Sequence, residues 1–154
     1  MGILWAVLAA VVADNAVVVL VGDGRNRGLV RCGTTLLHQL RTVGAWHGPV
    51  YALVNDGVRL PPVWAKMKVT PVYVKPFAAL RYHGSTAPYD KFYLFSLSAF
   101  RKHPALLYLD VDGNIRQPIA PLWRMLSASN QTLLMRDNGP GVGKGSFYSE
   151  EVKR

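Results

Sequence analysis

The sequence predicts an α/β domain of three layers, in which helices cover both faces of a mostly parallel sheet. Short runs of apolar, mainly β-branched residues at 16–21, 50–54 and 69–74 are typical of buried parallel strands. Segments with the spacing of a helix and turns rich in Gly, Asn and Pro separate these runs. Because strand and helix alternate, successive strands are expected to run in the same direction.

The first half of the chain predicts strand, helix, strand, short helix and strand. Residues 16–21 form the first strand, and a glycine-rich turn at 22–28 follows it. Residues 29–43 repeat apolar side chains at helical spacing, and Gly44 ends the helix. The apolar positions of this helix are Leu29, Cys32, Leu36, Leu37, Leu40 and Val43. Pro61-Pro62 opens a short helix or turn, and Pro71 places the strand at 69–74 on an edge of the sheet.

The second half of the chain continues the alternation. Residues 78–88 resemble a loop and residues 90–101 predict an aromatic-rich helix. The later elements expected are a strand at 106–109, a helix at 119–126 and a short strand at 132–135. We expect the strand at 106–109 to be central, with neighbours drawn from the strands at 16–21, 50–54 and 132–135.

Composition and charge limit the class of protein. With 154 residues, of which 50% are hydrophobic and 18% are charged, the chain fits one globular domain. The formal net charge of +9 favours anionic partners, which include nucleic acid, acidic membranes and phosphorylated small molecules. The basic residues are scattered and form no nucleic-acid-binding module, so no nucleic acid partner is expected. The single cysteine, Cys32, excludes an internal disulfide and a cysteine-based zinc cluster, and its place on an apolar helical face predicts a buried thiol.

The N-terminal segment has two interpretations. Residues 1–13 are almost wholly apolar, and no Lys or Arg precedes Arg25. The run is too short to span a bilayer as a helix, but it fits the hydrophobic region of a secretory signal or a short anchor at residues 1–15. The alternative is a hydrophobic first strand or helix of the fold. In either case residues 16–154 are expected to form the single folded domain.

Asp110 and Asp112 are the strongest candidates for a binding site. A buried strand that stops at Asp-x-Asp places both acids at the carboxyl edge of a sheet, where ligands bind in open α/β folds. Val111 between them points the other way, because side chains alternate along an extended segment. Two carboxylates so placed can hold Mg²⁺ or Mn²⁺, with a phosphate completing the coordination. The alternative is a polar turn, since Asp, Gly and Asn all favour turns.

Two further features could contact a phosphate. Lys91 lies one residue into the predicted helix at 90–101, where its ammonium could neutralise a diphosphate or could simply be a solvated charge. The glycine turn at 22–28 could present backbone N–H groups to a phosphate. Its spacing matches neither G-x-G-x-x-G nor the Walker A loop, so it identifies no nucleotide.

Three segments together carry a family resemblance: Tyr89-Asp90-Lys91-Phe92, Leu107-Tyr108-Leu109-Asp110-Val111-Asp112 and Gln117-Pro118-Ile119-Ala120-Pro121-Leu122-Trp123. They resemble segments of the nucleotide-diphospho-sugar transferases, whose Rossmann-like fold is called GT-A. The chain is similar in particular to the glycogenin-like glycosyltransferases of family eight, over roughly residues 16–137.

This resemblance implies a metal-dependent transfer of a hexose from a UDP-sugar to a hydroxyl acceptor on a glycan or protein, with retention at the anomeric carbon. Asp110 and Asp112 would hold Mn²⁺ or Mg²⁺ against the donor diphosphate, and Lys91 would approach the donor sugar or its phosphates. Asp137 would be the acid near the donor sugar, although it also fits a plain turn residue. The location implied is the Golgi lumen, with the cytoplasm as the alternative and membrane contact only through an N-terminal anchor.

The sequence departs from the family at three places. The segment 22–29 carries no aromatic residue to stack on uracil, and Gly113 stands where Thr or Ser is common. The Phe-Asn-x-Gly segment and the metal-binding histidine of the family would lie beyond Arg154. We therefore expect this chain to be the donor-binding half of such an enzyme, incomplete at its C-terminus, or an inactive relative, and to transfer little sugar alone.

Two other classes remain open. Asp110-Val111-Asp112-Gly113 also resembles the first motif of haloacid-dehalogenase-type phosphatases, in which the first Asp attacks phosphorus. That fold opens with the motif and needs several later strands, whereas here the motif lies late in the chain. The other class is a basic binding module without catalysis, in which the net positive charge would by itself attract an anionic partner.

Overall fold

The computed structural model describes residues 14–22, 27–55, 58–76 and 90–128. The chain divides into two compact units, Met1–Ala120 and Pro121–Arg154. The first unit contains the sheet and the candidate site. The second contains all but the first residue of helix α7, Ala120–Ala128, whose Trp123 is buried.

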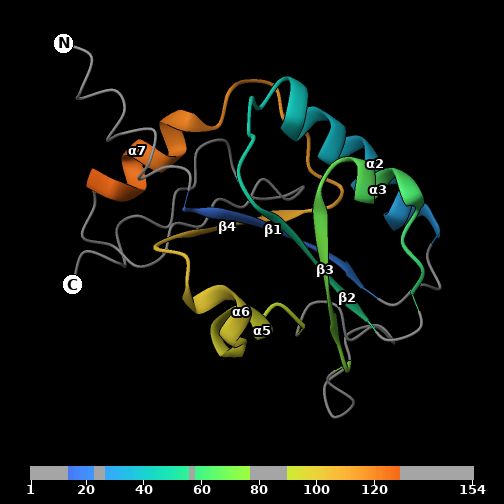
Figure 1. Cartoon of the computed structure of the whole chain (residues 1–154). Helices are drawn as coiled ribbons and strands as arrows, with labels where there is room; N and C mark the ends of the chain where they lie inside the picture. Colours follow the sequence, from blue (N-terminus) through green and yellow to red (C-terminus); the bar gives the residue numbers. More distant parts are fainter. Residues whose placement is uncertain (1–13, 23–26, 56–57, 77–89, 129–154) are drawn as a thin grey trace, which may run out of the picture. The chain divides into compact units, whose positions relative to one another are not determined.

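Within the described residues, four parallel strands form one sheet in the order β3-β2-β1-β4 (Figure 1). The strands are β1, Ala16–Gly22; β2, Val50–Asn55; β3, Val69–Val74; and β4, Leu106–Asp110. In the register, Val19 of β1 lies opposite Ala52 of β2 on one side and Leu109 of β4 on the other. Helices flank this all-parallel sheet, so the predicted α/β class is confirmed and the arrangement is Rossmann-like.

The position of β4 differs from the prediction. In the described sheet β1 and β2 are central, whereas β4 lies at one end of the order and pairs with β1. The predicted strand at 132–135 lies outside the described residues. The strand order therefore reverses at β1, which has β2 and then β3 on one side and β4 on the other. β3 lies at the opposite end, in agreement with the edge position that Pro71 predicted.

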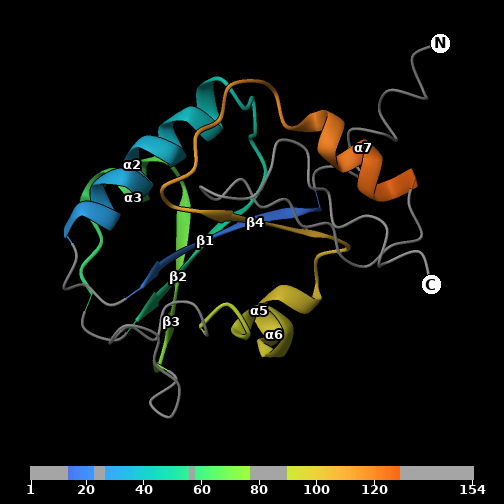
Figure 2. The ribbon, with the colours of Figure 1, turned by 180° about the vertical axis from the view of Figure 1, so that it is seen from behind.

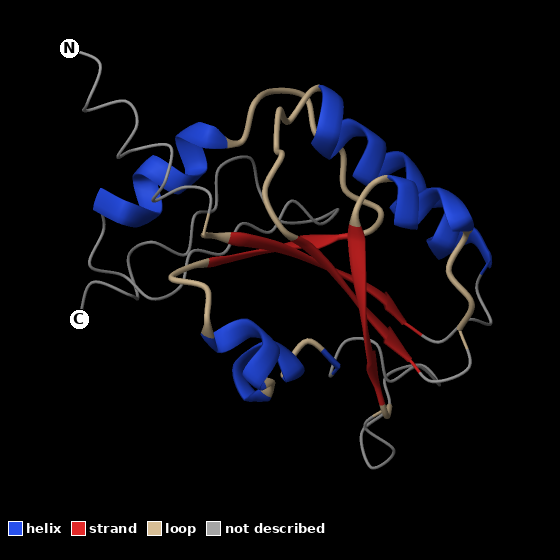
Figure 3. Ribbon diagram, in the orientation of Figure 1, coloured by secondary structure: helices blue, strands red, loops and turns tan. Residues whose placement is uncertain are grey.

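The two faces of the sheet are covered by different helices (Figures 1, 2 and 3). Helices α2, Arg27–Thr42, and α3, Pro62–Lys66, lie on one side, and α5, Tyr93–Ser96, and α6, Ser98–Arg101, lie on the other. On the α6 side, Phe100 is buried in a cluster with Val18 and Leu53. Alternation along β1 directs Val17, Val19 and Val21 to the opposite face, and all three are buried.

Helix α2 buries a narrower face than the sequence predicted. Leu36, Leu37 and Leu40 are fully buried, but Val43 is 42% exposed and Cys32 is exposed. At about 100° per residue, Cys32 and Val43 lie roughly a quarter turn from the centre of the leucine face. The prediction of a buried thiol was therefore wrong, because helical spacing places Cys32 at the flank of the buried stripe and not within it.

The predicted helix at 90–101 is two short helices. Leu97 is extended, with φ −77° and ψ 128°, and it separates α5 from α6. Its N–H donates to the Tyr93 carbonyl, and its own carbonyl accepts from the Phe100 N–H. The break allows both Leu97 and Phe100 to pack against the same face of the sheet.

Within the described part of the chain, no helix combines the length and apolar character needed to cross a membrane.

Candidate functional site

The carboxyl edge of the sheet brings together the ends of β1 and β4. β1 and β4 lie side by side where the strand order reverses, a position at which open α/β sheets bind ligands. β4 ends at Asp110, because the chain turns there and the Gly113 N–H donates to the Asp110 carbonyl at 2.9 Å. A Cβ on residue 113 would lie 2.9 Å from that same oxygen, so the turn as it stands requires glycine.

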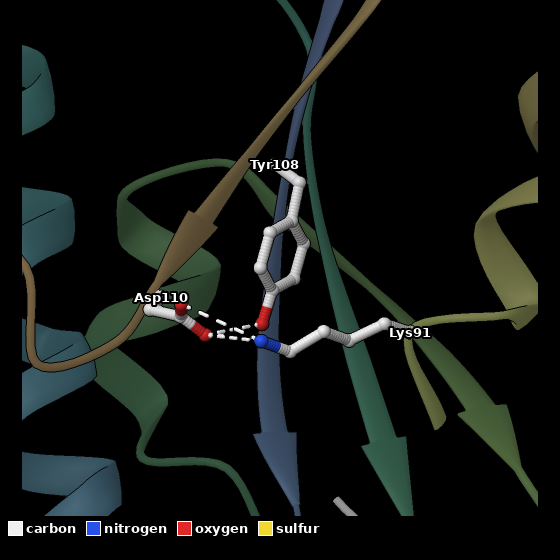
Figure 4. Close-up of polar contacts among 3 residues, drawn as sticks. All are labelled: Lys91, Tyr108 and Asp110. Atoms are coloured by element: carbon white, nitrogen blue, oxygen red, sulfur yellow. Dashed lines mark hydrogen bonds and ion pairs between the residues drawn. The ribbon is translucent and has the colours of Figure 1, made fainter. Parts of the chain in front are cut away.

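Lys91 meets Asp110 at this edge (Figure 4). The Lys91 Nζ lies 3.1 Å from Oδ1 and 3.5 Å from Oδ2 of the carboxylate. Lys91 comes from the turn before α5, and its ammonium also lies 4.9 Å from the centre of the Tyr108 ring. The two side chains of the ion pair are 40% and 58% exposed, so a dissolved ligand can reach both charges.

Tyr108 supports the same carboxylate from two residues earlier in β4. Its hydroxyl donates to Asp110 Oδ1 at 2.6 Å. Burial, followed by this hydrogen bond and the negative charges of Asp110 and Asp112, holds the pKa of Tyr108 well above its usual value. The phenol therefore stays protonated and remains a donor to Asp110. Since both acids act on the Tyr108 hydroxyl, the two negative charges lie in the same neighbourhood.

The residues that follow Asp110 alternate as the sequence predicted. Val111 is buried, and its Cγ1 would lie 3.4 Å from a Cβ placed on Gly33 of α2. Asp112 is exposed in the turn and makes no hydrogen bond or ion pair with the described residues. Val111 thus packs toward α2, whereas the carboxylates of Asp110 and Asp112 both remain exposed. Two exposed carboxylates are suitable ligands for a hard divalent cation.

A buried polar pair next to Lys91 was not predicted from the sequence. Asn55, the last residue of β2, is 1% exposed, and Asp90 is 0% exposed. The Asn55 Nδ2 donates to Asp90 Oδ2 at 3.1 Å, whereas the buried Asn55 Oδ1 accepts no hydrogen bond from the described residues. The sequence did place Asn55 directly after a buried strand and Asp90 directly before Lys91. It contained no indication that the two would be adjacent and buried.

Some predicted features lie outside the described residues. They include Asp137, residues 1–13 and positions 23–26 of the glycine turn. Of the predicted site residues that are described, the structure brings Lys91 into contact with Asp110 and leaves Asp112 exposed two residues further on.

Comparisons of the chain with protein-family models, with curated proteins and with solved structures gave no match. The class that the fold and site define is therefore a Rossmann-like α/β domain with a charged site at the carboxyl edge of its sheet.

Proposed function

We propose that this domain binds a UDP-sugar together with Mn²⁺ or Mg²⁺ and serves the transfer of a hexose to a hydroxyl acceptor. The observation that carries the proposal is the contact between Lys91 and Asp110 at the end of β4, with Asp112 exposed two residues later. Acidic and basic groups at one sheet edge are what a metal–diphosphate ligand needs, since the acids hold the cation and the ammonium faces the phosphates.

The donor set fits a divalent cation. Asp110 and Asp112 offer exposed carboxylate oxygens, the ligands that Mg²⁺ and Mn²⁺ prefer, and the remaining ligands would come from diphosphate and water. A cation bound there would offset the negative charge that grows on the diphosphate as the sugar leaves.

Lys91 is the residue that would connect the acids to the phosphates. Asp110 Oδ1 already accepts from the Tyr108 hydroxyl and lies 3.1 Å from the Lys91 ammonium. A cation on this carboxylate would compete with the ammonium for the same oxygens. The flexible stem of a lysine allows its charge to turn from Asp110 to a neighbouring phosphate oxygen without movement of the backbone.

The finer parts of the proposal follow from the family resemblance. They are retention at the anomeric carbon, a glycan or protein acceptor, Asp137 near the donor sugar, and delivery to the Golgi lumen by residues 1–13.

Calorimetry tests the proposal directly. UDP titrated into the protein with Mn²⁺ should release or absorb heat on binding, and Asp112→Ala should weaken this binding by roughly tenfold or more, about 1.4 kcal/mol. Asp14→Ala is the matched control, since it removes another exposed acid, next to the amino end of β1, and should leave the affinity unchanged. Equal UDP affinity in Asp112→Ala, or in wild-type protein with EDTA in place of Mn²⁺, would overturn the proposal.

A further inference from the structure

The Asn55–Asp90 pair is a feature that the metal and phosphate chemistry above leaves unused. Both side chains are buried, and they join the end of β2 to the residue that precedes Lys91. Burial of a carboxyl group opposes folding, and so does burial of an amide oxygen that has no partner among the described residues. Because an apolar pair of similar volume is often as stabilising as a buried polar pair, the contact between Asn55 and Asp90 is weak evidence of a role in stability.

The pair fixes one end of the segment that carries Lys91. Asp90 is held to β2 by the 3.1 Å hydrogen bond from Asn55. Two residues after Lys91, the Tyr93 hydroxyl donates to the Lys75 carbonyl at 2.7 Å, directly after β3. The Lys91 carbonyl accepts from the Leu94 N–H at 3.0 Å. The backbone of Lys91 is therefore held on both sides, by contacts to the ends of two neighbouring strands.

The same geometry directs the side chain. From this fixed backbone the Lys91 ammonium reaches Asp110 on β4, and it lies over the Tyr108 ring. β2 and β4 are separated by β1 in the sheet. The side chain of Lys91 thus spans from a segment anchored at the β2 and β3 ends to the acids at the β4 end.

We infer that Asn55 and Asp90 are positioning residues, which hold Lys91 where its ammonium serves Asp110 and the donor diphosphate. The inference rests on the proposed function for its purpose, but the position of Lys91 can be measured without metal or nucleotide. Neither Asn55 nor Asp90 needs to touch the ligand, because both act through the backbone of Lys91.

The position of the ammonium can be followed by NMR of protein labelled with ¹³C-lysine. The Hε protons of Lys91, assigned by their loss in Lys91→Met, should be shifted upfield by the Tyr108 ring. Asn55→Asp places two carboxyl groups face to face and removes the donor, so the upfield shift should be lost. Adding Asp90→Asn to Asn55→Asp reverses the direction of the hydrogen bond and should restore the shift.

Nucleotide binding provides the second measurement. UDP affinity in the presence of Mn²⁺ should fall roughly tenfold in Asn55→Asp and recover in the double variant, about 1.4 kcal/mol each way. If Asn55→Asp does not fold, Asn55→Ala is the second variant, because it removes the donor without adding a charge. An unchanged Lys91 shift in either folded single variant, or no recovery in the double variant, would overturn the inference.

The two proposals fail in different ways. A wild-type protein that shows the Lys91 shift but binds no UDP would contradict the proposed function while leaving Asn55 and Asp90 as positioning residues for Lys91. If the wild-type protein binds UDP with Mn²⁺, but the Lys91 Hε shift is the same in wild type and in the Asn55 variants, the positioning role alone would be contradicted.

Discussion

Replacement of Lys91 by Met should change metal binding and nucleotide binding in opposite directions. The change removes the charge and keeps an unbranched side chain. Two unit charges 3.1 Å apart attract by about 1.3 kcal/mol in bulk water. Because the two side chains are 40% and 58% exposed, the net value of the pair falls to about 0.2–1 kcal/mol.

Mn²⁺ alone should therefore bind Lys91→Met about 1.4- to fivefold more tightly than wild type, because the ammonium no longer competes for Asp110. UDP should bind the Mn²⁺-loaded variant roughly tenfold more weakly, since one charge-assisted hydrogen bond to phosphate, about 1.5 kcal/mol, is lost. The electron paramagnetic resonance signal of free Mn²⁺ measures the first affinity, and calorimetry measures the second.

Lys66→Met is the matched control for this pair of measurements, because it removes an exposed lysine of α3. It should leave both affinities close to wild type. The reasoning would be refuted if Lys91→Met bound Mn²⁺ more weakly than wild type, or if its affinity for UDP were unchanged.

Two further predictions concern residues that support the site. Burial and the hydrogen bond to Asp110 raise the pKa of Tyr108 above the value near 10 of an unfolded tyrosine, so the free energy of unfolding should fall as pH rises through about 10. In Tyr108→Phe, the fall in the free energy of unfolding should be smaller by about 1.4 kcal/mol per pH unit, as measured by urea unfolding at a series of pH values. Tyr73→Phe is the control, because Tyr73 is exposed. The same dependence on pH in Tyr108→Phe and wild type would contradict a raised pKa for Tyr108. Gly33→Leu should lower the free energy of unfolding by about 1–3 kcal/mol, because even a Cβ there lies 3.0 Å from the Trp64 ring, which a 2.7 Å hydrogen bond to Thr34 holds in place. The neighbouring exposed Cys32→Leu is its control, and equal urea midpoints for the two variants would contradict this packing.

The strands could be predicted from the sequence because a parallel strand that is buried on both faces consists almost entirely of apolar residues. β1 and β2 are buried on both faces, so their runs of Val, Leu and Ala stand out from the surrounding turns. The bounds of β3 were predicted to the residue, and Pro71 correctly indicated its edge position. The order of the strands was less accessible, since it depends on contacts between segments far apart in the chain, and β4 was wrongly expected to be central.

The helices differ from the prediction at positions where contacts with the sheet determine the structure. Leu97 has no helix-breaking property of its own, and its extended backbone is explained by the packing of Leu97 and Phe100 on the sheet. Cys32 satisfied the helical spacing within the accuracy of the pattern, yet it lies on the flank of the buried face of α2.

The candidate site was predictable in part for the same reason. Asp110 could be placed at the carboxyl edge because it ends an apolar strand. Lys91 was predicted only as a cation that could face a diphosphate, and its ion pair with Asp110 at 3.1 Å is a finding of the structure. The contact between Asn55 and Asp90 could not be predicted, because it joins residues 35 positions apart and depends on where the chain returns to the end of β2.

The central claim is that this domain binds a nucleoside diphosphate through a divalent cation. Calorimetric titration of the wild-type protein with UDP and Mn²⁺, with UMP and Mn²⁺, and with UDP and EDTA tests it most directly. If the acids and Lys91 act on the second phosphate and its cation as proposed, UDP with Mn²⁺ should bind at least roughly tenfold more tightly than either alternative. Equal affinities in all three titrations would contradict the account.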